Sequence, residues 1–262
     1  MDGRTQLAWR RPSKPVLGLM AGLFFIWLTF ALALNWGGGG EAIFRFLQGD
    51  SAAVLRGEVW RLATAPLLHT PVGPGAVTHI LFALLMIYFF VPALEEQWGA
   101  KRLFIFLGVA SVFAYAVESL LFLVLPTVAA PNWFGAMIFA DAAVVAWALS
   151  NRDRVLNLFF VLPIKPMMMV GFMVALHVLQ LITRQANPEG VFAPFAAMGA
   201  GFLFGGDSSP VRRVYLKWKL ARLQREVADL TKAGNKKKKR AKPSHLRVID
   251  GGADDDDKPV LH

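Results

Sequence analysis

The chain has 262 residues, of which 55% are hydrophobic and only 18% are charged, and its mean hydropathy is +0.46. A soluble domain carries roughly 25% charged residues, so this composition excludes a disordered chain, a coiled coil and a typical cytosolic enzyme. The absence of cysteine excludes disulfide bonds, thiolate catalysis and cysteine-ligated zinc. The apolar residues occur in long blocks, which predict an integral membrane protein.

Six apolar segments are predicted to be membrane helices, which gives an all-α, polytopic bundle. The first has 21 residues without a charge, and about 20 residues rising 1.5 Å each are enough to cross the hydrocarbon core. The six segments are residues 16–36, 77–94, 103–125, 133–149, 167–182 and 191–205.

The segment between the first two spans, residues 37–76, cannot cross hydrocarbon because charged residues interrupt its apolar ones. Trp60 and the arginines at 45, 56 and 61 favour an amphipathic loop in the membrane interface, where indole rings and snorkelling arginines are stable.

The basic residues predict the orientation of the chain. With six spans and a cytoplasmic N-terminus, 24 of the 28 Lys and Arg residues lie on the cytoplasmic side, as the positive-inside rule requires. We therefore expect residues 1–15 and the tail 207–262 to be cytoplasmic, residues 16–206 to form the membrane domain, and the protein to reside in a plasma (bacterial inner) membrane.

The tail contains a predicted amphipathic helix at 211–233, followed by the basic run Lys236–Arg240. Basic residues beside a membrane attract anionic lipid by about 1 kcal/mol each, although they can equally serve only to fix the topology. Nucleic acid is not an expected partner, because no folded basic domain with interleaved aromatic residues accompanies the run.

Four ionisable residues lie at membrane depth in predicted spans: His79 near the start of the second span, and Glu118, Asp141 and His177 further inside theirs. A charge at the bilayer centre costs about 2.5–3.5 kcal/mol on insertion scales. These residues therefore belong either to a proton or ion pathway or to a hydrogen-bonded network between helices. Neither a His-Glu-x-x-His zinc motif nor a phosphate-binding loop is present, so no metal or cofactor is predicted.

An ordered set of motifs over about residues 15–206 resembles the rhomboid family of six-helix intramembrane serine proteases. The matching positions are Trp60, Arg61, His69, His79, Glu95, Gly99, Arg102, Trp133, Gly135, Ala197, Gly201 and Gly205. The resemblance implies that Trp60 and Arg61 organise the interfacial loop, that Glu95 belongs to a polar clasp, and that the last three form a small-residue packing face.

The catalytic positions depart from the family pattern. Aligned on Trp-Phe-Gly, the family's nucleophilic serine falls on Ile138 and the glycine after it on Phe139. The family's general base falls on Pro194, and an asparagine that helps to hold the oxyanion falls on Ala83. Isoleucine cannot attack a carbonyl and proline cannot accept a proton, so this chain lacks the Ser-His dyad.

The resemblance therefore predicts a catalytically inactive rhomboid, a pseudoprotease, which binds transmembrane segments of client proteins. Two alternatives remain open at this point. One is an active rhomboid protease with a displaced site, and the other is a proton- or ion-coupled transporter that uses Glu118, Asp141 and His177.

Overall fold

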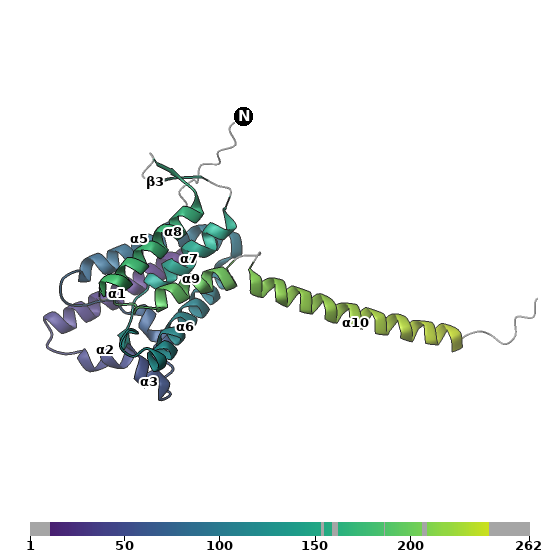
Figure 1. The fold of residues 1–262 in the computed structure, drawn as a ribbon, viewed down its shortest axis with the longest axis horizontal. Helices are drawn as coiled ribbons and strands as arrows, with labels where there is room; N and C mark the ends of the chain where they lie inside the picture. The colour runs from purple at the N-terminus through teal and green to yellow at the C-terminus, as the bar shows by residue number, and fades with distance from the viewer. Residues whose placement is uncertain (1–10, 153–154, 159–161, 186, 206–208, 241–262) are drawn as a thin grey trace, which may run out of the picture. The chain divides into compact units, whose positions relative to one another are not determined.

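The computed structural model describes residues 11–152, 155–158, 162–185, 187–205 and 209–240. It divides into two units, residues 1–214 and 215–262, and the first unit contains the membrane domain (Figure 1).

The membrane domain is built from six apolar helices. Four of them are long and apolar enough to span a bilayer, namely α1 (Lys14–Asn35), α5 (Ala76–Trp98), α6 (Ala100–Val124) and α8 (Pro166–Thr183). The other two, α7 (Met137–Ser150) and α9 (Ala193–Phe204), are shorter. These helices coincide with the six predicted segments, and the predicted all-α fold is confirmed.

The segment at 37–76 is more ordered than the expected interfacial loop. It folds into α2 (Glu41–Leu47), α3 (Ser51–Leu55), α4 (Arg61–Thr64) and a 3-10 turn, η1 (Ala65–Leu67). Strand β1 (Gly49–Asp50) pairs antiparallel with β2 (Asn132–Trp133), so the start of the predicted fourth span is a strand rather than a helix. α2 and α3 lie at one end of the bundle, opposite the hairpin of β3 (Leu156–Leu158) and β4 (Leu162–Ile164) (Figure 1).

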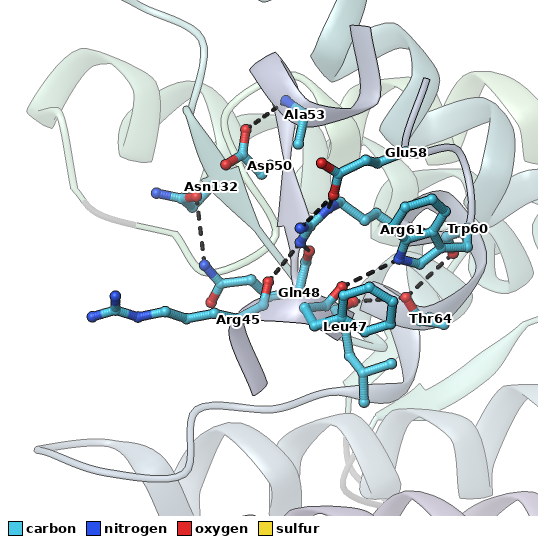
Figure 2. Close-up of polar contacts among 11 residues, drawn as sticks. Arg45, Leu47, Gln48, Asp50, Ala53, Glu58, Trp60, Arg61, Thr64 and Asn132 are labelled. Carbon is cyan, nitrogen blue, oxygen red and sulfur yellow. Dashed lines mark hydrogen bonds and ion pairs between the residues drawn. The ribbon is translucent and has the colours of Figure 1, made fainter. Parts of the chain in front are cut away.

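A single guanidinium holds the interfacial segment together (Figure 2). Arg61 is buried and donates from Nη1 to the carbonyl oxygens of Arg45 and Gln48, each at 2.6 Å, and from Nε to Glu58 at 2.8 Å. Thr64 donates to the Leu47 carbonyl at 2.7 Å. These bonds satisfy carbonyls at the end of α2, which its own helix leaves without partners.

α7 lies at the centre of the bundle, where it contacts α5, α6, α8 and α9, and all its residues from Ile138 to Ala148 are buried. Two glycines allow α9 to approach it closely. A Cβ atom on Gly201 would lie 2.5 Å from the Ala142 carbonyl oxygen, and one on Gly205 would meet Ala146. The small-residue face of α9 is therefore the contact between these helices.

α8 buries little of its surface. All its residues are described, and Pro166 is the one among them that is buried. α10 runs from Pro210 to Arg240, longer than the predicted 211–233, and most of it belongs to the second unit.

We expect Gly201→Ala to destabilise the membrane domain and Gly199→Ala not to. Both changes gain the helix propensity of alanine, about 1 kcal/mol, but a Cβ at Gly199 meets no atom within 4 Å. Overpacking at position 201 should cost about 1–3 kcal/mol. Thermal unfolding in detergent measures the difference, and equal melting temperatures for the two variants would contradict the close contact.

Candidate functional site

The residues that the resemblance aligns with the rhomboid catalytic centre lie where α7 and α9 begin. Gly201 faces Ala142 and Gly205 faces Ala146, so the two helices run parallel. Ile138 and Pro194 are both buried, and Phe139 is only 5% exposed. Pro194 is the second residue of α9, a position at which proline loses no helical hydrogen bond.

The buried carboxylate of Glu118 positions the loops on both sides of this site. It accepts backbone N–H groups from Ala130 at 2.7 Å, from Phe192 at 2.5 Å and from Ala193 at 2.8 Å. The last two belong to the start of α9, where the helix dipole favours a negative group. Backbone hydrogen bonds thus account for the burial of the Glu118 side chain, and a second ionisable side chain is not its partner.

A second carboxylate, that of Glu189, enters the site from the loop between α8 and α9. Its Oε1 atom lies 2.9 Å from Nε2 of His79 on α5, and its side chain is 3% exposed. It fills the space beside Gly135, where a Cβ atom would come within 2.7 Å of the Glu189 carboxyl carbon. Gly135 has φ +133°, so both its conformation and its neighbour require glycine.

Two hydrogen bonds hold the backbone of Gly135. Its N–H donates to the Ala65 carbonyl at 3.1 Å, and its carbonyl accepts from the Tyr115 hydroxyl at 2.8 Å. The Tyr115 ring stacks on Trp133 with centroids 4.1 Å apart, and Trp133 donates to Ser51 at 2.9 Å. The site is therefore a rigid junction of the interfacial segment, α6 and the start of α7.

His69 completes the polar side of the site. Its ring lies 5.1 Å from that of His79, and neither of its nitrogens has a hydrogen-bond partner among the residues that the structure describes. Burial, and then the neighbouring His79, lower the pKa of His69 from 6.5 to about 3. His69 is consequently neutral in the folded protein at ordinary pH.

A separate polar pair joins α7 to α8 below the site. His177 Nε2 lies 3.3 Å from Asp141 Oδ1, and His177 Nδ1 lies 3.2 Å from Gln180. The two membrane-depth residues Asp141 and His177 are therefore brought together, whereas Glu118 has different partners. Over the described ranges, no group of three or more His, Asp or Glu side chains is suited to hold a metal ion.

The other predicted positions lie away from the site. Glu95, near the end of α5, accepts from the Ser13 hydroxyl at 2.7 Å and thereby joins α5 to the start of α1. Gly99 separates α5 from α6 with φ +79°, and the guanidinium of Arg102 lies over the Trp98 ring.

Comparison with known proteins gives the family. The model of the rhomboid domain matches residues 56–206, more than half of the chain, and the chain therefore belongs to the rhomboid family. YdcA of Bacillus subtilis (strain 168), whose name assigns it to the rhomboid proteases, is 33% identical over 100 residues, which cover 36% of this chain and 46% of YdcA.

A second relative from the same organism, the rhomboid protease GluP, is 27% identical over 155 residues. That match covers 59% of this chain and 29% of GluP. The chain thus spans less than half the length of either relative.

Sequence reasoning missed Glu189. It lies in a polar loop outside every predicted span, and no motif marks it. Glu189 lies beside His79 through a contact between residues 110 positions apart in the sequence. The local sequence shows only a single carboxylate just before the predicted sixth helix.

We expect acid to destabilise the protein through His69. In the unfolded state His69 takes up a proton near pH 6.5, but in the folded state it does so only near pH 3. The contribution of neutral His69 to the free energy of unfolding is therefore complete above pH 6.5 and is lost as the pH falls toward 3. The loss should approach about 1.4 kcal/mol per pH unit. Denaturant titrations in micelles from pH 7.5 to 4 should show a shallower dependence for His69→Phe, and identical slopes would contradict this origin.

Proposed function

We propose that this rhomboid is catalytically inactive and binds transmembrane segments of client proteins. The observation that carries the proposal is the pair of side chains at the dyad positions, Ile138 and Pro194, both buried. Without a hydroxyl, no side chain at these positions can attack a carbonyl, and without a base, none can accept the proton of a nucleophile. In a serine protease the loss of either member costs about 10⁶-fold in rate.

Glu189 gives independent support. A rhomboid needs room beside its nucleophile for substrate and water, but here Glu189 fills the space at Gly135 and bonds His79. A carboxylate in this place also opposes a developing oxyanion, because like charges repel. Both the space that Glu189 fills and its repulsion of an oxyanion therefore disfavour acyl transfer at this site.

A displaced serine site has less support. Ser111, Ser119 and Ser150 each donate to carbonyls of their own helices, as mid-helix serines commonly do. His79 and His177 face carboxylates. A transporter has less support as well, because Glu118 is fully occupied by backbone N–H groups and is not part of an ionisable chain.

We expect no cleavage of a transmembrane reporter by the protein, in detergent or in liposomes. The double variant Ile138→Ser, Pro194→His should also be inactive and less stable, since an unpaired buried polar group costs about 1–3 kcal/mol. Phe139→Gly, Ala83→Asn and Glu189→Gly added to it form the minimum set for activity.

The matched control for this series is the same five-site variant with Ile138→Ala in place of Ile138→Ser, which must be inactive in every case. Cleavage by the unaltered protein, or its labelling by a serine-directed probe, would refute the proposed inactivity. Robust cleavage by the double variant would show that Phe139 and Glu189 do not obstruct the site.

The proposal places the protein in a plasma (bacterial inner) membrane with both termini in the cytoplasm. The support is the distribution of Lys and Arg, 24 of 28 on that side. We expect a reporter fused after Pro210 to give a cytoplasmic signal and one inserted at 126–132 to give an external signal. An external signal after Pro210 would overturn the six-span topology.

α10 is proposed to attract anionic lipid to the cytoplasmic face. Its apolar residues Leu216, Leu220 and Leu223 are exposed, and basic residues stand between them, including Lys217, Lys219 and Arg222. Apolar burial and charge attraction together favour a lipid surface for such a helix.

A further inference from the structure

A hydrogen bond buried at membrane depth joins α8 to α7. The Asp141 side chain on α7 is 1% exposed and His177 on α8 is 14% exposed, and their atoms Oδ1 and Nε2 are 3.3 Å apart. Asp141 Oδ2 is also buried, and it has no hydrogen-bond partner among the described residues. The carboxylate therefore has an unused acceptor in a place where such groups are costly.

The helix that covers Asp141 has limited apolar contact with the rest of the bundle. Over its full, described length α8 buries Pro166 alone, and its apolar side chains Phe172, Leu179 and Ile182 are more than half exposed. Its apolar packing against the core comes from partly buried side chains, among them Met169, Val170 and Met173. A helix that replaces α8 must therefore supply comparable apolar contact and also a donor for Asp141.

We propose that Asp141 on α7 recognises a client transmembrane helix that carries a basic side chain, and that this side chain takes the place of His177 of α8 beside Asp141. This assignment rests on the proposed binding of transmembrane segments and specifies which segments are bound. A lysine or arginine carries several donor hydrogens, so it can bond both oxygens of Asp141, including the second, unpartnered one.

The structure also sets the depth of that basic residue. Asp141 is the fifth residue of α7, and His177 is six residues before the end of α8. At 1.5 Å per residue, these positions lie roughly 6 and 9 Å from the helix ends. A lysine one to two turns inside an apolar segment snorkels to the interface when the helix is alone, so the free client is tolerated in lipid.

The experiment uses the full chain in nanodiscs and a set of labelled peptides with one 23-residue apolar stretch. Since the chain has no cysteine, Val124→Cys gives a single site for a fluorescent donor. The peptides carry lysine five residues from one end, norleucine at that position, or lysine at the centre. Energy transfer gives the dissociation constant of each.

We expect the end-placed lysine peptide to bind about 3- to 30-fold more tightly than the norleucine peptide, the range of polar contacts between membrane helices. The central-lysine peptide should show a smaller gain. Asp141→Asn should abolish the preference for the end-placed lysine peptide without weakening the binding of the norleucine peptide. His177→Leu should strengthen that preference, because Asp141 then has no partner on α8.

The matched control is Glu95→Gln, a carboxylate at a different end of the membrane domain, which should keep the preference. Equal binding of the lysine and norleucine peptides to the unaltered protein and to His177→Leu would overturn the role of Asp141 and leave client binding intact. This comparison holds even if Asp141→Asn fails to fold. Failure of every peptide to bind would overturn the proposed function itself.

Discussion

The arrangement of the site depends on one buried carboxylate. Glu118 accepts three backbone N–H groups, from Ala130 before the strand β2 and from Phe192 and Ala193 at the start of α9. A donor left unpaired in a buried place costs about 1–3 kcal/mol, so these bonds contribute to the stability of the junction. Because Glu118 fixes both loops, it also fixes where Glu189 enters the site and where α9, with Pro194 as its second residue, begins.

The site combines a cluster of buried apolar side chains with a pair of polar side chains. Ile138, Phe139 and Pro194 are buried at the start of α7 and α9, while His79 and Glu189 face each other beside Gly135. A hydrolytic site needs space for water between its side chains, but here the Glu189 carboxylate occupies the space beside Gly135. The scaffold is that of the rhomboid family.

α8 differs from its neighbours in how it is held. α7 and α9 are joined by glycines that let their backbones approach, a contact that depends on van der Waals packing over many atoms. α8 is held by partly buried side chains such as Met169, Val170 and Met173 and by the Asp141–His177 hydrogen bond. Under the proposed function, this less buried contact makes α8 the side of the bundle at which a client helix would enter.

The sequence by itself determined the membrane class, the six apolar segments, and the residues at the dyad positions. These properties are local: hydropathy is a sum over about 20 neighbouring residues, and Ile138 lacks a hydroxyl in any fold. Arg61 also belongs here, because its motif marks the interfacial segment that it organises through bonds to nearby carbonyls.

Only the tertiary structure decided which polar groups meet. Glu118, Asp141 and His177 had equal standing in the sequence, yet Asp141 pairs with a residue 36 positions away and Glu118 with backbone groups 12, 74 and 75 positions away. Glu189 had no signal at all before its bond to His79. Such pairings are set by helix register and loop closure across the whole bundle, and in a medium without water they decide which buried charge is structural and which is available to a partner.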